Sequence, residues 1–447
     1  MKHKNGLGLG ALVALALGTV VGAGVVTLTG QAIAVTGRSA WLAYLIATVA
    51  GFLMIVPYAL LGNCMIPKGG NYTITATFLG DRWGGFIGIS AVLIIFNMGL
   101  FGSGFGQYVN VLFPAVPAKT AALLGITFFF ILNLTGVQKM AKVQNILSVI
   151  LFVGLGLFIL LGISKTSGQG MDLKAPDFFT HGAEGFGAAV MLLAASTVGH
   201  KNIINFTSEA RNPKRDVPKA LAITSAIILV LYIGIAFVNS TVLPVEQVAG
   251  KPLTEVAKVI MPGMLYYLFI IGGPLASLST TINSAFAIMS TPIRQAARDG
   301  WFPEKIAVTN KNGIPYIIYI LVYLVGILPI ILNLSIKIIT SNVVLIVSIS
   351  ELIVFFAIWR LPRILPEAWE KRYYKLPKTV FYIGVGAAIL LRGIFVALSL
   401  KNLTPVLAVT TIGLFVIFFI YATVLVKAQK VNVKKSYEIE SNTNLGG

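Results

Sequence analysis

The chain has 447 residues, of which 57% are apolar and only 11% are charged, and its mean hydropathy is +0.88. Because soluble domains contain roughly a quarter charged residues, this composition predicts an integral membrane protein. The net charge of +19 could indicate a nucleic-acid partner, but the basic residues stand between apolar runs, so we expect none and interpret the charge as a topology signal. The single cysteine, Cys64, excludes a disulfide framework and a cysteine metal site.

Twelve apolar stretches are long enough to cross a hydrocarbon core about 30 Å thick, and we expect twelve transmembrane helices of an all-α integral protein of the cell membrane. The first follows "MKHKN", which has the basic start of a signal peptide, but the apolar run continues past Val26 and predicts a retained helix. The spans lie at residues 8–36, 41–65, 84–112, 119–136, 143–164, 184–206, 217–241, 263–290, 314–333, 338–360, 379–399 and 403–426.

The basic residues predict the orientation of these spans. If the N-terminus is inside, most of the 34 Lys and Arg residues fall in segments on the cytoplasmic side, as the positive-inside rule requires. Residues 1–7 and 427–447 are therefore expected to be cytoplasmic ends. The second of these is polar and is predicted to be disordered.

No catalytic motif accompanies the spans. The sequence has neither a paired metal-ligand motif nor a nucleophile motif, so we expect no enzymatic activity, no cofactor and no certain metal site. The glycines of "GSGFGQ" at 102–107 are interpreted as a helix-packing face rather than a phosphate loop. Because small residues occur on many of the helices, they do not indicate an oligomeric state.

The first span contains "GTVVGAG", with Gly18, Gly22 and Gly24 within seven residues. Each glycine costs a helix about 1 kcal/mol relative to alanine. One explanation is a packing face in which Gly18 and Gly22 let another helix approach closely. The other is a broken helix, in which the backbone amides that start the second half point at an anion.

The sixth span contains a matching interruption. Its apolar residues give way to a polar stretch from Ser196 to Asn202 before the apolar pattern resumes. Polar groups at membrane depth are costly unless they line a cavity. A second interruption five spans after the first favours two broken helices over simple packing.

Five patterns, in order between residues 18 and 303, resemble signatures of the amino acid–polyamine–organocation (APC) permeases, nearest to the neutral amino acid transporter and exchanger branch. They are "GTVVGAGVVTLTGQAIAVTGRSAWLAYLI", "PKGGNYTITATFLGDRWGGFIG", "NLTGVQKMAKVQNIL", "NFTSEARNPKRDVPKAL" and "RQAARDGWFP".

The resemblance implies a fold and a function. The fold is the leucine-transporter type, a five-plus-five inverted repeat (8–164 and 184–360) with broken helices 1 and 6, followed by two helices within 379–426. The function is secondary active transport of an amino acid by alternating access, as a permease or exchanger, with Na⁺ or H⁺ as the possible coupling ion. Two alternatives stay open: transport of a related organic anion or amine on the same fold, and a nutrient sensor that does not transport.

The resemblance also implies where a substrate binds. Its carboxylate would lie on amides at the positive end of one half-helix, and its amino group on carbonyls of the two broken ends. These groups are the amides of Gly22, Ala23 and Gly24 and the carbonyls of Val20, Ala195, Ser196 and Val198.

The sixth span departs from the family pattern at its break. Ala195 and His200 stand where the family often has aromatic residues, so the pocket should be wider or more polar. Lys201 stands where neutral or acidic residues are common. If Lys201 faces the cavity, it favours an anionic substrate side chain or carries a proton. Alternatively, it pairs with Glu209 or Glu351 and never meets substrate.

Other polar residues in the spans are further candidates. Thr280 and Thr281 could hold Na⁺ near the first break, or could simply bond to their own helix backbone. Glu351, in the tenth span, is either a proton site or paired, because a lone ionised carboxylate there is costly. The remaining assignments are Asn97 and Gly199 as pocket residues, Glu209 as an inner gate, Leu151 in place of a lysine that substitutes for Na⁺ in relatives, and Arg392 as a structural or interfacial charge.

Overall fold

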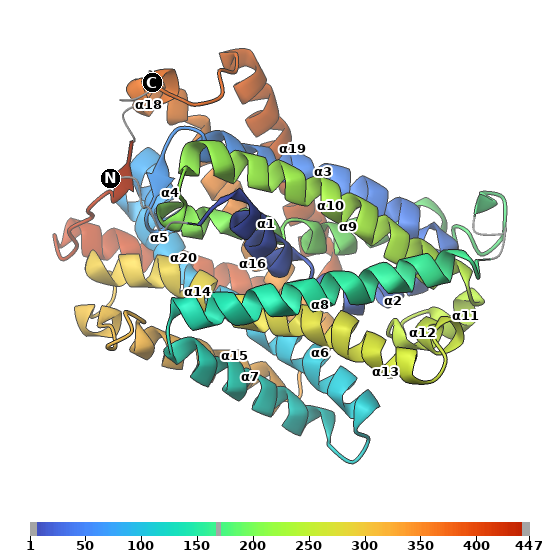
Figure 1. Cartoon of the computed structure of the whole chain (residues 1–447). Helices are drawn as coiled ribbons and strands as arrows, with labels where there is room; N and C mark the ends of the chain where they lie inside the picture. The colour runs from blue at the N-terminus through green and yellow to red at the C-terminus, as the bar shows by residue number, and fades with distance from the viewer. Residues whose placement is uncertain (1–6, 167–170, 440–447) are drawn as a thin grey trace, which may run out of the picture.

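The computed structural model describes residues 7–166 and 171–439, apart from some side chains within them, and shows an almost entirely helical protein (Figure 1). Within these ranges, nine helical stretches are long and apolar enough to cross a membrane. Three shorter apolar helices, Leu9–Val20, Ala118–Leu134 and Tyr316–Ile331, lie in other expected spans. The protein is therefore a multi-pass helical membrane protein.

Each expected span contains one or two of the helices. In chain order these are α1 (Leu9–Val20), α2 (Ala23–Thr36), α3 (Ala40–Gly62), α5 (Asp81–Ile94), α6 (Asn97–Leu112), α7 (Ala118–Leu134), α8 (Val137–Ile163), α9 (Gly182–Thr197), α10 (Pro213–Thr241), α13 (Met264–Ile270), α14 (Ala276–Arg298), α15 (Tyr316–Ile331), α16 (Ile336–Trp359), α19 (Lys378–Asn402) and α20 (Pro405–Lys427). The shorter elements are α4 (Asn71–Leu79), α11 (Val245–Val248), α12 (Thr254–Ile260), α17 (Leu361–Ile364), α18 (Pro366–Glu370), β1 (Ile66–Pro67) and β2 (Tyr437–Glu438). Short 3₁₀ helices lie at Gly37–Ser39 and Glu304–Ala307.

Four of the spans depart from a regular α-helix. The first breaks between α1 and α2, and in the sixth α9 gives way to a 3₁₀ helix, Gly199–Glu209, as the sequence indicated. Two further irregularities were not predicted. The chain turns between α5 and α6, and a π-helical turn, Ile271–Leu275, joins α13 to α14. The π turn contains Pro274, which cannot donate a backbone hydrogen bond.

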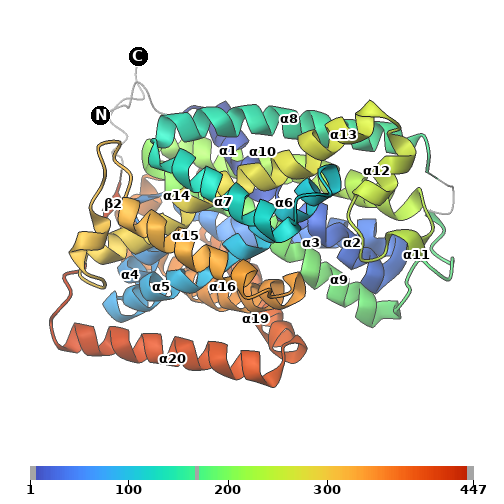
Figure 2. The ribbon, with the colours of Figure 1, turned by 90° about the horizontal axis from the view of Figure 1, so that it is seen from below.

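Apolar side chains cover the outer surface of the helical bundle. Val230 on α10 is 73% exposed, Leu160 on α8 is 70% exposed and Val409 on α20 is 69% exposed. Figure 2 shows α20 along one edge of the bundle, where it packs against α5. Such large exposed apolar groups are expected where the surrounding medium is lipid.

The two described ends of the chain are tied to the same end of the bundle (Figures 1 and 2). Leu7 forms a β-bridge with Ala210, and β2 pairs antiparallel with β1. Lys68 Nζ lies 2.5 Å from a carboxylate oxygen of Glu438. The tail is therefore not disordered throughout, because β1 offers unpaired backbone groups that β2 satisfies.

Candidate binding cavity

A cavity of about 230 Å³ lies where the broken helices meet. Its wall combines both half-helices of the first span and the break of the sixth with α6, α14, α16 and α19. The volume is somewhat below the roughly 300–1,000 Å³ of pockets for drug-sized ligands, so it suits a small molecule. The predicted site residues that line it are Val20, Gly22, Gly24, Asn97, Ser196, Val198, Gly199, Lys201, Thr281 and Glu351.

The N-terminus of α2 meets this cavity without a side-chain cap. Gly22 is the N-cap residue and has no side chain that could form a capping hydrogen bond. Both Gly22 and Gly24 line the cavity. The first amides of a helix have no partner within the helix and carry partial positive charge. This end of α2 is therefore suited to an anion.

Two glycines allow α2 to lie against its neighbours without intervening side chains. A Cβ atom at Gly22 would overlap the Thr281 hydroxyl on α14. A Cβ atom at Gly24 would overlap the Ser196 side chain on α9. Any larger residue at these positions would separate the helices that form the cavity.

Gly18 and Gly199 have related packing roles. Gly18 lies against the side-chain amide of Gln144 on α8, so it serves helix packing away from the cavity. A Cβ atom at Gly199 would lie 2.5 Å from the Thr19 carbonyl oxygen and 2.9 Å from Val20 Cα. The two broken segments therefore touch backbone to backbone. The first span is therefore broken near Gly22, as one explanation predicted, and packs closely at Gly18, as the other did, whereas the anion at the break stays a prediction.

Hydroxyl groups of neighbouring helices hold the carbonyls at the breaks. Tyr232 Oη on α10 donates to the Val20 carbonyl at 2.6 Å and lies 3.4 Å from the Ser196 carbonyl. Ser277 Oγ on α14 donates to the Val21 carbonyl at 3.1 Å. One tyrosine thus joins the ends of both broken helices.

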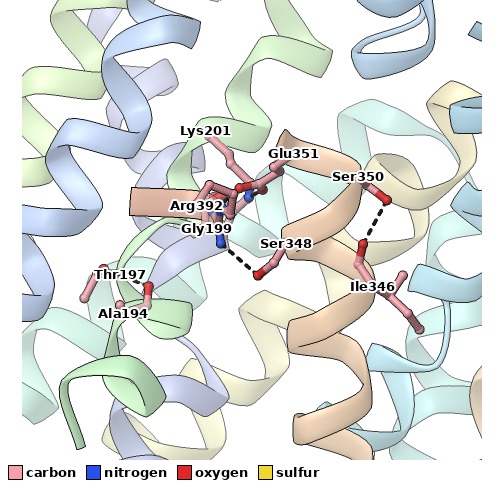
Figure 3. Close-up of polar contacts among 10 residues, drawn as sticks. Ala194, Thr197, Gly199, Lys201, Ile346, Ser348, Ser350, Glu351 and Arg392 are labelled. Carbon is pink, nitrogen blue, oxygen red and sulfur yellow. Dashed lines mark hydrogen bonds and ion pairs between the residues drawn. The ribbon is translucent and has the colours of Figure 1, made fainter. Parts of the chain in front are cut away.

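Three charged side chains meet on the cavity wall. Lys201 Nζ forms an ion pair with Glu351 Oε1, and an Nη atom of Arg392 forms one with Glu351 Oε2. Arg392 also donates to Ser348 Oγ at 3.3 Å. Figure 3 shows Lys201, Glu351 and Arg392 pointing toward one another from three different segments. None is more than 9% exposed, so the charges stabilise one another in a site largely closed to solvent.

The hydroxyls of the predicted ion site bond to their own helix. Thr280 Oγ1 and Thr281 Oγ1 both donate to the Ser277 carbonyl, at 2.7 and 3.1 Å. Thr281 lines the cavity, whereas Thr280 does not. The described part of the chain contains no group of three or more His, Cys, Asp or Glu side chains able to hold a metal ion.

Some predicted residues lie elsewhere. His200 is fully buried away from the cavity, and its Nε2 atom lies 2.8 Å from Ser225 Oγ on α10. We expected His200 to make the pocket more polar, but its side chain does not line the cavity. The side chains of Ala23, Ala195 and Glu209 lie outside the described residues, and the gate assigned to Glu209 with them.

Sequence reasoning missed Arg392 and Tyr232 as parts of the site. Arg392 was expected to be structural because its helix follows the repeats, yet it lines the cavity. Its signal was present, since an arginine inside an apolar span needs a partner. Tyr232 carries no such signal, because a tyrosine in a membrane helix is common and only the fold brings its hydroxyl to Val20.

The fold and the cavity together define an integral membrane protein whose broken helices surround an internal cavity of small-molecule size. The chain matches the amino acid permease family model over residues 7–438 and belongs to this family of the APC superfamily. It is therefore a transporter of a small molecule rather than an enzyme.

Two relatives carry names that agree with this assignment, and a third is uncharacterised. The chain is 25% identical over 339 residues to the branched-chain amino acid permease BcaP of Bacillus subtilis, covering 70% of this chain and 72% of that protein. It is 26% identical over 343 residues to the aromatic amino acid permease FywP of Lactococcus lactis subsp. cremoris, covering 70% and 73%. An uncharacterised protein of Methanocaldococcus jannaschii is 25% identical over 315 residues, covering 68% and 71%.

Proposed function

We propose that the protein is a secondary active transporter of amino acids that works by alternating access in the cell membrane. The observation that carries the proposal is the cavity formed by both helix breaks. At Gly22 and Gly24 it borders an uncapped helix N-terminus, and at Val20 and Ser196 it borders backbone next to the broken helix ends. An α-amino acid carries a carboxylate and an ammonium group on the same carbon, and these match amides on one side and carbonyls on the other.

The positions of the breaks and irregularities support an inverted repeat of five helices. The first and sixth spans are broken, and the third, between α5 and α6, and the eighth, at Ile271–Leu275, each contain a local irregularity within a continuous helix. The fourth and ninth spans hold the short helices α7 and α15, of 17 and 16 residues. All three pairs are five spans apart. We therefore assign residues 8–164 and 184–360 to the two repeats and residues 379–426 to two added helices, for twelve spans in total.

The names of relatives support the substrate class. BcaP is named as a branched-chain and FywP as an aromatic amino acid permease. Branched-chain and aromatic amino acids share the α-amino acid core and differ in their side chains. The substrate of this protein is expected to share that core, which the backbone groups at the two breaks would bind.

Counterflow in proteoliposomes tests this function. Vesicles loaded with a mixture of unlabelled amino acids should take up a radiolabelled amino acid transiently above its equilibrium level, and protein-free vesicles should not. Binding without counterflow would identify a nutrient sensor instead. Counterflow of an amine or organic acid with no counterflow of any amino acid would favour transport of a related organic anion or amine on the same fold.

The same vesicles assign the coupling ion. We expect net uptake to be driven by a gradient of Na⁺ or of H⁺, with the Thr281 hydroxyl as a ligand in the first case and Glu351 as the proton site in the second. An imposed Na⁺ gradient and an imposed pH gradient are compared without internal substrate. Loss of Na⁺ stimulation in Thr281→Ala would support the hydroxyl site, and uptake that needs only internal substrate would indicate an exchanger.

The proposed orientation places both termini in the cytoplasm. Cys64 is fully buried, so the native chain should give little background with a membrane-impermeant thiol reagent. Lys165→Cys and Lys430→Cys place thiols at exposed positions on opposite predicted sides. In intact cells the first should be labelled and the second protected.

A further inference from the structure

The cavity holds more positive than negative charge. The charged side chains among the described residues that line it are Lys201, Arg392 and Glu351. Two basic side chains therefore share one carboxylate. With both of them protonated the cavity carries one excess positive charge, which is costly at this depth and which a bound anion would neutralise.

The geometry shows that Glu351 is fully engaged. Its two carboxylate oxygens are divided between the two cations, one to Lys201 and the other to Arg392. Arg392 also donates a hydrogen bond to Ser348 Oγ, with an N–O distance of 3.3 Å. Its Nε atom is buried and has no hydrogen-bond partner among the described residues. An arginine carries five N–H donors, so this guanidinium still has a donor for another acceptor.

The charges of an amino acid core do not supply that anion. The α-carboxylate and α-amino group of a bound zwitterion cancel one another, and the proposed function places them on backbone groups at the two breaks. Neither Glu351 nor the zwitterionic core neutralises the second positive charge of Lys201 and Arg392. A negative group on the substrate side chain would neutralise it, and would meet a guanidinium suited to carboxylate geometry.

We propose that the transported substrate is an amino acid with an anionic side chain, whose side-chain carboxylate lies against Arg392 and Lys201. The proposal rests on the proposed function and narrows its substrate class. A volume of about 230 Å³ admits a short side chain of this kind. The neutral side chains named for the relatives would leave the extra charge of this cavity uncompensated.

The test compares pairs of substrates that have nearly the same shape and differ in charge. Counterflow of labelled glutamate and aspartate is measured beside that of glutamine and asparagine in the same proteoliposomes. We expect the acidic member of a pair to be at least tenfold more effective in competition. In detergent, glutamate should raise the unfolding temperature of the wild-type protein more than glutamine does, because only a ligand that binds the folded state stabilises it.

Two variants link the preference to the charge cluster. Arg392→Gln removes the excess charge and should abolish the preference for glutamate over glutamine. Ser348→Ala removes a partner of Arg392 without changing charge and should keep the preference. If Arg392→Gln does not fold, the comparison of glutamate with glutamine on the wild-type protein still tests whether the substrate is anionic.

The outcomes distinguish this inference from the function on which it rests. Counterflow of neutral amino acids with no advantage for acidic ones would overturn the anionic substrate and leave amino acid transport intact. Absence of counterflow for every amino acid would overturn both. A glutamate preference that persists unchanged in Arg392→Gln and in Lys201→Met would also overturn the assignment to these side chains.

Discussion

Tyr232 and Val20 are joined by a hydrogen bond of 2.6 Å from the tyrosine hydroxyl to the carbonyl at the end of α1. The same hydroxyl lies 3.4 Å from the Ser196 carbonyl near the end of α9. One buried hydroxyl of α10 thus contacts both breaks, beside their direct backbone contact at Gly199. A movement that separates α1 from α9 should lose at least one of the two hydroxyl contacts.

Tyr232→Phe should weaken substrate transport while leaving the protein folded. The ring stays in place beside Tyr44, with ring centroids 5.2 Å apart, and only the hydroxyl that positions the Val20 carbonyl is removed. A net hydrogen bond contributes about 1 kcal/mol, so we expect roughly a fivefold fall in apparent affinity. The measurement is the concentration dependence of uptake in proteoliposomes.

Tyr108→Phe is the matched control for that variant. Tyr108 Oη donates to the Val26 carbonyl inside α2 at 2.7 Å, so an equally buried hydroxyl is lost away from the breaks. Its affinity for substrate should stay close to wild type. Equal effects of the two variants would show that Tyr232 acts only on stability.

Gly22→Ala should abolish uptake. The added Cβ atom would overlap the Thr281 hydroxyl and force α2 away from α14. Thr281→Ala removes the overlapping oxygen, so the double variant Gly22→Ala/Thr281→Ala should regain part of the activity. Gly10→Ala, on α1 with no atom within 4 Å of its Cβ position, should retain uptake. Wild-type uptake by Gly22→Ala would contradict the close packing at the break.

Glu351→Gln should destabilise the protein strongly. The change leaves two buried cations without their carboxylate, and breaking a buried ion pair in this way costs about 3–5 kcal/mol. The double variant Glu351→Gln/Arg392→Gln has the same net charge as wild type and should recover part of the loss. Thermal unfolding in detergent measures both, and a single variant as stable as wild type would contradict the ion-pair assignment.

Tyr72→Phe should destabilise the end of the bundle that holds the two described chain ends. Trp301 Nε1 donates to Tyr72 Oη at 2.8 Å, and Tyr72 Oη donates to Asp299 at 2.6 Å. Losing the hydroxyl leaves the buried Trp301 Nε1 group without this partner, at about 1–3 kcal/mol, and removes one of the hydrogen bonds to the Asp299 carboxylate. Tyr373→Phe, whose ring is 43% exposed, should change the unfolding temperature little. Equal unfolding temperatures for the two variants would contradict this network.

Asp299 should make stability depend on pH. Burial raises the pKa of the Asp299 carboxyl, although hydrogen bonds from Tyr72 and Gln295 oppose the rise. The folded state therefore holds this proton more tightly than the unfolded chain, whose Asp pKa is about 3.9. The resulting stabilisation is complete below the unfolded pKa and is lost as pH rises through the folded pKa. The stability of wild type relative to Asp299→Asn should fall across that window, and a constant difference would contradict the expectation.

Much of the helical pattern could be predicted because it depends on local properties. Runs of apolar residues and clusters of glycine mark spans and breaks without reference to distant parts of the chain, and all twelve expected spans contain helix. The irregularity before α6 escaped prediction because Ile95 and Phe96 are apolar and keep helical backbone angles. The strand at Tyr437–Glu438 escaped for another reason, since its partner β1 lies far away in the chain.

The sequence by itself determined that the chain is a helical membrane protein with breaks near Gly22 and Val198, because hydropathy and helix propensity act over short stretches. Only the tertiary structure decided which polar groups meet. Lys201, Glu351 and Arg392 lie on three separate segments, and His200, next to Lys201, faces Ser225 instead of the cavity. Neighbours in sequence point in different directions around a helix, so the composition of a membrane-embedded site depends on how the helices pack.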